Sequence, residues 1–421
     1  MLIEFVGCGY LCSMSKKLVV IGGGASGFFC AIRAAEKYPD AQITIVEKQQ
    51  KVLQKVKVSG GGRCNVTHAC FKISELVKNY PRGASFLKKS FRHFQPQDTM
   101  QWFESRGISL KIEKDGRVFP QSDSSQSIID VLLFEIEKRQ IQLRLQTEII
   151  QIERSTIGFE LVTQHQERIY CDALFVGSGG HAKATGFEPI RALGHQIVPP
   201  LPSLFTFNLP AHPITAFSGL SAEPVEVKIS GTDFKQVGPL LITHWGMSGP
   251  AILKLSAFAA RELAAHQYHQ TFLVNWLNIP EHQLREKWPL IRQQKSSQTM
   301  GSKNPFELPA RLWQYLLSTS EINEEWRWSE LPAKEQNKLI HELTSSAFTL
   351  KGKTTYKEEF VTCGGVDLSE VNPDTMESRI HKGLFFGGEI LDVDGITGGF
   401  NFQHAWTSGY IAGTYVFATS T

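Results

Sequence analysis

The chain has 421 residues, more than the ~100–200 of one ordinary domain, which predicts two or three domains. Hydrophobic residues make up 42% and charged residues 20%, which is typical of a soluble globular protein, and no apolar run approaches the ~20 residues that span a bilayer. A formal net charge of +3 neither requires nor excludes a nucleic-acid partner.

The seven cysteines form no CxxC pair and no Cys/His metal pattern, so we expect reduced thiols, no metal site and a cytoplasmic location. Residues 1–13 are apolar but lack the positive n-region and the length of a signal peptide. A second methionine, Met14, precedes the first predicted strand. We interpret the segment before it as a disordered extension or the product of an upstream start.

The first elements along the chain predict a βαβ unit. A β-rich run at 17–21 breaks into the glycines of 22–27, a helix follows from 28 to about 37, and a strand at 42–46 ends in Glu47. After the glycines of 59–62 we expect a hairpin around Asp115 and Gly116 and a capped helix over 123–139. Strands are predicted at 141–153, 158–164, 167–171 and 173–177.

The second half of the chain begins with prolines that punctuate strand-like stretches from about residue 199, followed by a helical, tryptophan-rich stretch at 256–346. Strand character returns at about 347, and a strand at 383–387, a glycine/aspartate loop and a helix from about 402 close the chain. These elements predict an α/β fold with a two-part Rossmann-type domain built from both chain ends. We assign residues 15–198 and 363–421 to that domain, 199–255 and 347–362 to an inserted β-barrel, and 256–346 to a helical subdomain.

The glycine turn of the βαβ unit has the spacing of a dinucleotide site. Gly22 permits the tight turn, Gly24 lets the backbone meet a pyrophosphate, and Gly27 lets the helix pack on the strand. Amides at the amino end of the helix, from Ala25 and Ser26, are free to bind phosphates. Glu47, followed by Lys48, is placed to accept the adenosine ribose hydroxyls and disfavours a 2′-phosphate, so the pattern indicates FAD or NAD rather than NADP. The alternative is a glycine turn without a ligand.

Four further observations favour FAD over NAD. A predicted three-stranded meander lies between the helix at 123–139 and the strand at 173–177, as in two-dinucleotide-binding flavoproteins. The turn containing Gly179 and Gly180 follows that meander, and a second glycine-rich crossing, with Gly388 and Glu389, lies near the carboxyl end. The chain has no second complete GxGxxG motif, so we expect no separate NAD(P)H domain.

Four sequence motifs resemble those of the bacterial YhiN/BaiN-like flavoproteins. They are SGGGRCNVT at 59–67, GRVFP at 116–120, THWGMSGP at 243–250, and GGE at 387–389 with DVDGITGGFN at 392–401. The resemblance runs from about 18 to 413 and implies a glutathione-reductase-like FAD domain with a barrel-plus-helical insert. It also implies oxidoreductase activity, since members are linked to the reduction of carbon–carbon double bonds in bile acids and to dihydrouridine formation in ribosomal RNA. His68 stands where many relatives have asparagine. The loop after Gly180 is shorter than in relatives, so a substrate contact of that loop in relatives is not transferred to this chain.

Roles for the second glycine cluster follow from its residue types. Gly60, Gly61 and Gly62 let backbone amides approach the pyrophosphate or the flavin ring. Arg63 offers a planar positive charge to a phosphate or a flavin carbonyl, with a structural salt bridge as the alternative. Cys64 has no cysteine partner near in sequence, and we favour buried packing over redox chemistry.

Two sites concern the reaction itself. If Gly398, Gly399, Phe400 and Asn401 aim the amino end of the closing helix at the flavin, its dipole stabilises the negative charge of reduced flavin; the alternative is a helix that is merely packed on the sheet. His244, expected on a glycine-rich strand-to-helix turn, is the candidate catalytic acid, with a core histidine as the alternative.

Three functions stay open at this stage. The first is an FAD-dependent reductase that takes hydride from NAD(P)H and reduces an unsaturated small molecule. The second is a flavin-dependent enzyme that modifies RNA, motivated by the family link and by the basic, aromatic stretch at 78–94, whose alternative is a solvated helix face. The third is a binding protein that has lost flavin, against which the intact glycines and Glu47 argue. The oligomeric state is not indicated.

Overall fold

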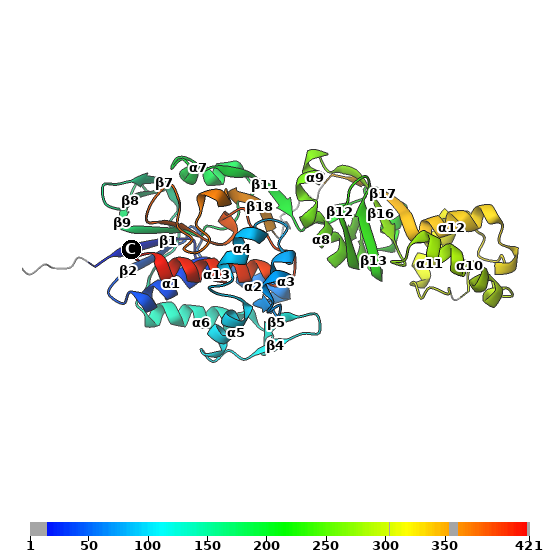
Figure 1. Ribbon diagram of the computed structural model, residues 1–421, viewed down its shortest axis with the longest axis horizontal. Helices are drawn as coiled ribbons and strands as arrows, with labels where there is room; N and C mark the ends of the chain where they lie inside the picture. The colour runs from blue at the N-terminus through cyan, green and yellow to red at the C-terminus, as the bar shows by residue number, and fades with distance from the viewer. Residues whose placement is uncertain (1–14, 303, 353–360, 419–421) are drawn as a thin grey trace, which may run out of the picture.

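The computed structural model describes residues 15–302, 304–352 and 361–418, so the interpretation of residues 1–13 lies outside the described part. Two bodies lie side by side along the long axis (Figure 1). One has a hydrophobic core drawn from residues 18–204 and 361–417 together with Ala257, and the other a core drawn from residues 205–350. We call residues 15–204 and 361–418 the terminal domain and residues 205–352 the insert. The domain boundaries expected from the sequence stay predictions.

The terminal domain is built on a five-stranded parallel sheet in the order β19-β10-β1-β2-β6. Val20 of β1 lies between Phe175 of β10 and Ile45 of β2. Apart from β6 at the edge, the strands are short runs rich in β-branched and aromatic residues, as expected of a parallel sheet that is covered on both faces. The strands are β1 (Lys17–Ile21), β2 (Gln42–Val46), β6 (Gln142–Arg144), β10 (Ala173–Val176) and β19 (Leu384–Phe386). Because β19 comes from the far end of the chain, the predicted two-part Rossmann-type α/β fold is confirmed.

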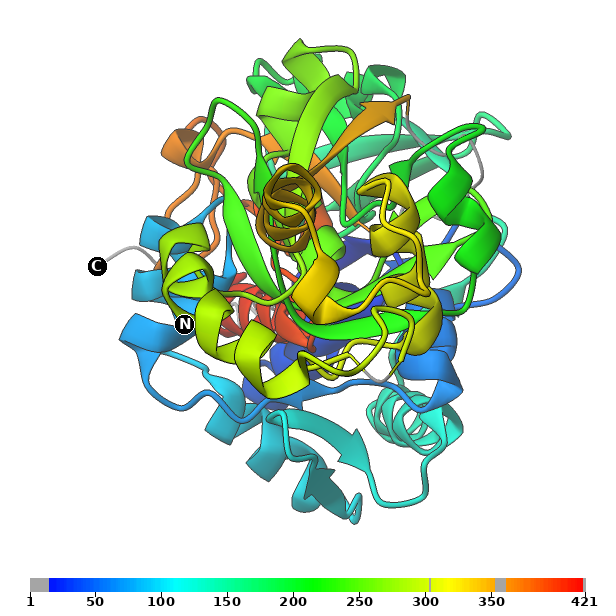
Figure 2. The same ribbon diagram turned by 90° about the vertical axis from the view of Figure 1, so that its right-hand side faces the viewer.

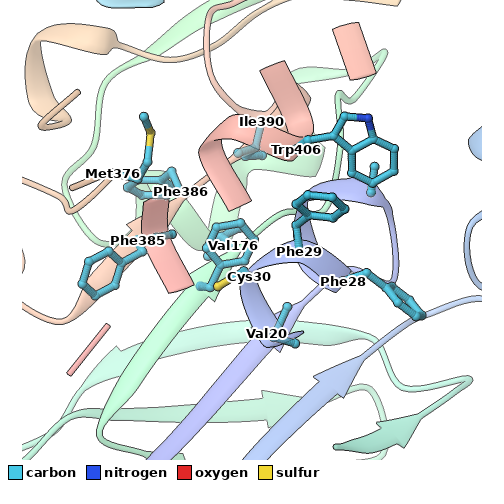
Figure 3. Close-up of a cluster of buried hydrophobic side chains, with 14 of the residues drawn as sticks. Val20, Phe28, Phe29, Cys30, Val176, Met376, Phe385, Phe386, Ile390 and Trp406 are labelled. Atoms are coloured by element: carbon cyan, nitrogen blue, oxygen red, sulfur yellow. The ribbon is translucent and has the colours of Figure 1, made fainter. Parts of the chain in front are cut away.

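Two helices from opposite chain ends, α1 (Ala25–Lys37) and α13 (Phe400–Tyr415), pack closely against each other. A Cβ on Gly409 would lie 2.3 Å from the carbonyl oxygen of Ser26, so only glycine permits this approach. One turn further on, Gly413 meets the backbone of Cys30 in the same way. The side chains of Phe29 and Trp406 meet in the core beside this contact, with ring centroids 4.5 Å apart (Figure 3).

The segment between β2 and β10 holds the predicted helix and meander. Helix α6 (Ser125–Lys138) begins after Ser124, whose side chain accepts the amide of Gln126. The antiparallel meander consists of β7 (Ile149–Arg154), β8 (Phe159–Thr163) and β9 (Arg168–Cys171). The prediction of one strand over 141–153 is wrong: β6 joins the parallel sheet and β7 the meander. The strand is interrupted where Gln146 adopts a left-handed φ of 50°.

The remaining parts of the terminal domain are short. A small sheet has the order β3-β5-β4, and its hairpin of β4 and β5 confirms the turn predicted at Asp115 and Gly116. Its strands are β3 (Thr67–His68), β4 (Leu110–Ile112) and β5 (Arg117–Pro120). The short helices are α2 (Gln54–Gly62), α3 (Ile73–Leu76), α4 (Ala84–Ser90), α5 (Pro96–Glu104) and α7 (Glu188–Arg191), with 3₁₀ turns η1 (Val77–Asn79), η2 (Ala184–Phe187), η5 (Leu368–Glu370) and η6 (Gly388–Ile390).

The basic, aromatic stretch at 78–94 forms part of η1 and all of α4. Its aromatic side chains, Tyr80, Phe86, Phe91 and Phe94, are buried in the core of the terminal domain. Its basic side chains at 78, 88, 89 and 92 are exposed. The aromatic rings are therefore not available to stack on nucleic-acid bases, and the stretch is a helix face with a charged exterior.

The insert begins with a six-stranded antiparallel sheet in the order β12-β15-β14-β13-β16-β17. The sheet curves into a barrel-like form, with α8 (Pro250–Phe258) and α9 (Ala260–Ala265) on the side nearer the terminal domain (Figure 1). Its strands are β12 (Phe207–Asn208), β13 (Ser221–Ile229), β14 (Lys235–Thr243), β15 (Gly246–Ser248), β16 (His269–Asn275) and β17 (Ser346–Lys351). The stretch at 256–346, which we expected to be helical, also contains β16, an inner strand of this sheet with alternating burial.

The far end of the insert is helical, and Figure 2 shows these helices in front of the sheet. The helices are α10 (Glu281–Lys295), α11 (Ala310–Thr319) and α12 (Ala333–Ser345), with 3₁₀ turns η3 (Pro213–Phe217) and η4 (Trp328–Glu330). Buried tryptophans pack this end: the rings of Trp313 and Trp328 are stacked with centroids 6.2 Å apart, and Trp288 lies 5.7 Å from Trp328.

A two-stranded ribbon of β11 (Ile197–Ser203) and β18 (Val361–Val366) connects the two bodies. The chain enters the insert after β11, and β18 belongs to the return into the terminal domain (Figure 1). No helix among the described residues has both the length and the hydropathy to cross a membrane.

Candidate cofactor site

The turn between β1 and α1 is shaped by three glycines with different surroundings. A Cβ on Gly22 would lie 2.3 Å from the carbonyl oxygen of Gly177, and one on Gly27 would lie 2.0 Å from that of Gly22. A Cβ on Gly24, in contrast, would meet no heavy atom within 4 Å. Gly22 and Gly27 therefore serve close packing of the backbone, while Gly24 faces open space.

The amino end of α1 opens onto that space. Gly24 is its N-cap residue, no side chain of the described residues caps the helix, and the first turn carries no acidic residue. The first intrahelical amide bond runs from Phe28 to the carbonyl of Gly24. The amides of residues 25–27 and the positive end of the helix dipole are therefore directed at whatever occupies the open space, an arrangement that suits an anion.

Glu47 lies at the end of β2 beside this turn. Its carboxylate accepts the amide of Gly23 at 2.8 Å and that of Gln49 at 2.9 Å, and the side chain is half-buried. A carboxylate has about four acceptor positions, so two remain for a diol. Lys48, the next residue, is exposed.

The carboxyl-terminal glycine turn lies directly against the first one. Ser26 Oγ donates to the carbonyl of Gly387 at 3.3 Å, and a Cβ on Gly388 would lie 2.7 Å from Ser26 Oγ. Ser408 of α13 accepts the amide of Gly388 at 2.8 Å. The structure thus brings together residues 26 and 388, which are far apart in the sequence, as the predicted site requires.

The turn after β10 forms a third wall. Gly179 has a φ of 80° and faces open space, while a Cβ on Gly180 would come within 3.0 Å of the Glu389 side chain. Glu389 also pairs with Lys55 of α2 and accepts the amide of Thr362 at 3.1 Å. The three glycine turns and α2 therefore surround one region.

The glycines at 60–62 end α2 with left-handed backbone: their φ values are 57°, 69° and 85°. All three are exposed, and Gly61 and Gly62 face open space. Gly60 packs against the ring of Phe119. Gly61 and Gly62 thus leave space for a ligand, and its binding by their backbone amides stays a prediction.

Arg63 makes contacts within the protein. Its guanidinium bonds to the Glu113 carboxylate at 2.7 Å and lies 4.0 Å from the centroid of the Phe119 ring. The pair with Glu113 is the structural salt bridge that we named as the alternative to ligand binding. The neighbouring Cys64 is buried, and burial raises the pKa of its thiol to about 12, so it is not a thiolate at neutral pH.

The amino end of α13 is held by the segment that follows Cys64. With its amide oriented to satisfy its neighbours, Asn65 accepts the amide of Gly399 at 3.0 Å and donates to the carbonyl of Thr67 at 2.9 Å. Gly399 is the N-cap residue, with a φ of 91°. A Cβ there would lie 2.6 Å from the Thr67 backbone, so glycine is required. Helix α13 thus begins at Phe400, two residues earlier than predicted.

Other ties fix the first turn of α13. Asn401 bonds to both backbone groups of Gly395, accepting the amide at 2.7 Å and donating to the carbonyl at 2.8 Å. Tyr80 donates to the carbonyl of Phe400 at 2.7 Å. Gly398 has a φ of 124° and packs against Phe400. Asn401 is therefore engaged with its own loop, and the amide dipoles of this helix end remain the groups available to a ligand.

Two histidines near these turns were not assigned a role by sequence reasoning. His404 of α13 donates from Nε2 to the carbonyl of Gly388 at 3.1 Å, and burial lowers its pKa to about 4. His68 stacks on Phe400 with centroids 4.7 Å apart, and burial lowers its pKa. The only sequence signal for His404 was its position one helical turn after Phe400, which puts it near the predicted cofactor site.

His244 is not where the sequence placed it. It lies in the hairpin turn between β14 and β15 rather than on a strand-to-helix turn, because Gly246 starts another strand and the helix begins only at Pro250. The side chain is exposed and its ring lies beside Trp245. The alternative of a core histidine is therefore wrong, and the role as catalytic acid stays a prediction.

A serine–histidine–carboxylate array occurs elsewhere in the terminal domain. His195 is buried, its Nδ1 lies 2.8 Å from Glu370 Oε2 and its Nε2 lies 3.0 Å from Ser378 Oγ. Ser378 Oγ also accepts the amides of Ile380 and His381 at 3.0 and 2.9 Å. Its lone pairs are thus engaged in a turn, so the array joins two segments of the fold and is not a nucleophile site.

The arrangement fits an extended dinucleotide. A bare, uncapped helix end and an open Gly24 suit its pyrophosphate, Glu47 suits the adenosine ribose, and the end of α13 suits an electron-rich ring. The described residues contain no group of three or more His, Cys, Asp or Glu side chains arranged to hold a metal ion.

The family model of the HI0933-like protein Rossmann domain matches residues 16–415. The 3-dehydro-bile acid delta(4,6)-reductase of Clostridium scindens is 28% identical over 406 residues, which cover 94% of this chain and 98% of that protein. The ribosomal RNA dihydrouridine synthase of Escherichia coli is 29% identical over 401 residues, covering 93% and 96%. Among solved structures, Escherichia coli quinol fumarate reductase aligns with a TM-score of 0.48 at 16% identity, covering 96% of this chain and 70% of that one.

Proposed function

Because the chain belongs to the HI0933-like family and is an FAD-dependent oxidoreductase, we propose that it reduces a carbon–carbon double bond of a small molecule with NAD(P)H as the electron donor. The observation that carries the proposal is the convergence of the turns at 22–27, 177–180 and 387–389 at the amino end of α1, where His404 and Ser408 of α13 bond to Gly388. The names of the relatives support the reaction class, since one is a reductase at the delta(4,6) positions and dihydrouridine is uridine with one double bond reduced.

The residues divide the work of holding the cofactor. The amides of residues 25–27 would bind the pyrophosphate and Glu47 the ribose, with the backbone at 61, 62 and 179 closing around them. Bound FAD would supply hydride transfer between NAD(P)H and the substrate. The amino end of α13 would offset negative charge where it develops, because its dipole is fixed by Asn65 and Gly399 before the reaction. We retain His244 as the proposed proton donor.

A direct experiment uses purified protein reconstituted with FAD. We expect a yellow protein with one FAD per chain whose absorbance near 450 nm (a general property of oxidised flavin) bleaches when NADH or NADPH is added without oxygen. If neither NADH nor NADPH bleached the bound flavin, NAD(P)H would be ruled out as the electron donor. A colourless protein after FAD addition would instead favour a fold relative that binds other ligands, against which the bare Gly24 and the placed Glu47 argue.

A second candidate substrate is ribosomal RNA. It is favoured by the Escherichia coli relative and by a 29% identical ribosomal RNA dihydrouridine synthase of Haemophilus influenzae that covers 94% of this chain. The buried aromatic rings at 78–94 do not support it. Mass spectrometry of ribosomal RNA from wild-type and deletion cells decides, because equal dihydrouridine in both removes RNA as the substrate.

A further inference from the structure

Arg82 joins the terminal domain to the insert close to the place where the chain crosses between them. Its guanidinium pairs with both oxygens of Asp394 in a bidentate contact. Nη1 donates to the carbonyl of Ala257 in the last turn of α8 at 2.7 Å, and Nη2 donates to Ser203 Oγ at 3.3 Å. Ser203 ends β11 and itself donates to Asp394 at 2.7 Å. One side chain therefore contacts the terminal domain, the connecting ribbon and the insert.

The contact is almost completely removed from water: the Arg82 side chain is 9% exposed and that of Asp394 is 0% exposed. A buried ion pair is a weak source of stability, because desolvation offsets most of the attraction. Its geometry, however, is demanding. The planar fork of arginine satisfies its partners only when α8, β11 and the Asp394 loop are in one relative position. The carbonyl of Ala257 belongs to the negative end of the α8 dipole, which further favours a cation there.

Asp394 belongs to the loop at 392–399, which leads directly into α13. The carbonyl of Gly395 in this loop accepts a bond from the Asn401 side chain, and Ile396 donates to the carbonyl of Asn79 at 2.9 Å. At the other side of the loop, Asp392 pairs with Arg261 of α9 at 2.8 Å and accepts the amide of Gly364 of β18 at 3.1 Å. The loop is thus fixed from the insert on one side and fixes the start of α13 on the other.

We propose that Arg82 and Asp394 are positioning residues, which couple the docking of the insert to the loop that sets the amino end of α13. The inference rests on the proposed function, in which that helix end faces the cofactor. Neither side chain touches the reacting atoms. They act by holding α8 of the insert and the loop before α13 in one relative arrangement.

The test compares two double variants with the wild-type holoenzyme. Arg82→Met/Asp394→Asn removes the interdomain pair without leaving a lone buried charge. Arg106→Met/Glu135→Gln is the control inside the terminal domain: it removes a pair 2.8 Å apart, with side chains 18% and 5% exposed, and leaves the Glu36–Arg139 pair of the same cluster in place. Amide hydrogen exchange is followed in α8 and in 392–399, with and without FAD, and the midpoint potential of bound FAD is measured.

In Arg82→Met/Asp394→Asn we expect exchange at least tenfold faster in both segments, although they belong to different bodies, and a shifted flavin potential. The control should leave both readouts unchanged. Arg82→Lys serves if the double variant does not fold: a lysine keeps the charge for Asp394 but lacks the fork, so exchange should rise in α8 first. The coupling would be overturned if a folded Arg82 variant showed amide hydrogen exchange at the wild-type rate in both α8 and residues 392–399. A wild-type protein that binds no FAD would refute the proposed function, while exchange in the FAD-free proteins would still decide the coupling.

Discussion

Substitution of Gly24 by valine separates cofactor binding from folding. The backbone at Gly24 has φ −97° and ψ −173°, an extended conformation that valine adopts without strain, and a Cβ there meets no atom within 4 Å. As the N-cap residue without a side-chain cap, it contributes little to the helix, so we expect the FAD-free variant to change in stability by less than about 1 kcal/mol. The same side chain would fill the space that we propose for the pyrophosphate.

The loss in affinity follows from the bonds that the valine displaces. Moving the pyrophosphate away from the end of α1 would break two amide–phosphate hydrogen bonds, each contributing about 1.5–3 kcal/mol because the acceptor is charged. The total of about 3–6 kcal/mol corresponds to roughly a hundred- to ten-thousandfold weaker FAD binding. Titration of FAD-free protein with FAD, followed by flavin fluorescence, measures this loss, and thermal unfolding of the same samples without FAD measures the fold.

Gly27→Ala is the matched contrast, because its Cβ would lie 2.0 Å from the carbonyl oxygen of Gly22. Overpacking of this kind costs about 1–3 kcal/mol, so this variant should unfold at a lower temperature even without FAD. A Gly24→Val protein that binds stoichiometric FAD with wild-type affinity would refute the assignment of the open space at α1 to the pyrophosphate.

Three further outcomes are expected. Burial lowers the pKa of His404 to about 4, so below about pH 6.5 the unfolded chain takes up a proton before the folded protein does. The free energy of unfolding should therefore fall by about 2 kcal/mol between pH 7 and pH 5. The His404→Gln variant, which can still donate to Gly388, should lose this part of the pH dependence in urea unfolding. Burial raises the pKa of Cys64 to about 12 and that of Cys363 to about 11. Iodoacetamide at pH 8 should therefore leave both thiols unmodified until urea is added. Rapid labelling of either thiol in the folded protein would contradict their burial. If His244 donates the proton, His244→Gln should lower kcat by at least about a hundredfold with FAD binding intact, and an unchanged kcat would remove it from the reaction.

Local patterns predicted the parts of the fold whose signals lie within a few residues. The βαβ unit, the meander and the capped helix α6 all have clear periodicity and end signals, and the YhiN/BaiN-like resemblance agrees with the family shown by comparison. The curved sheet of the insert was harder to predict, because β16 lies between helices in the sequence and its pairing with β13 and β17 is not local. The break near Gln146 was missed for a similar reason, since a left-handed residue other than glycine leaves no strong mark in the sequence.

The sequence predicted the parts of the candidate site that require glycine. It did not predict the partners of charged side chains, because several partners are chemically possible for each. Gly22, Gly24 and Gly388 are brought together as the motifs indicate, because each serves a close backbone approach or an open face. Arg63 instead meets Glu113, which lies about fifty residues away in sequence and on a different element. The contacts of Arg82 with Ser203 and Asp394 likewise depend on how the two bodies dock, which no short motif specifies.

A crystal structure of the protein bound to FAD tests the central claim most directly. We expect the pyrophosphate within hydrogen-bonding distance of the amides at 25–27, the adenosine ribose on Glu47, and the flavin ring near the amino end of α13 at Gly399 and Phe400. A dinucleotide bound elsewhere, or one that contacts the turn at 22–27 but not the carboxyl-terminal segment at 387–401, would contradict the account.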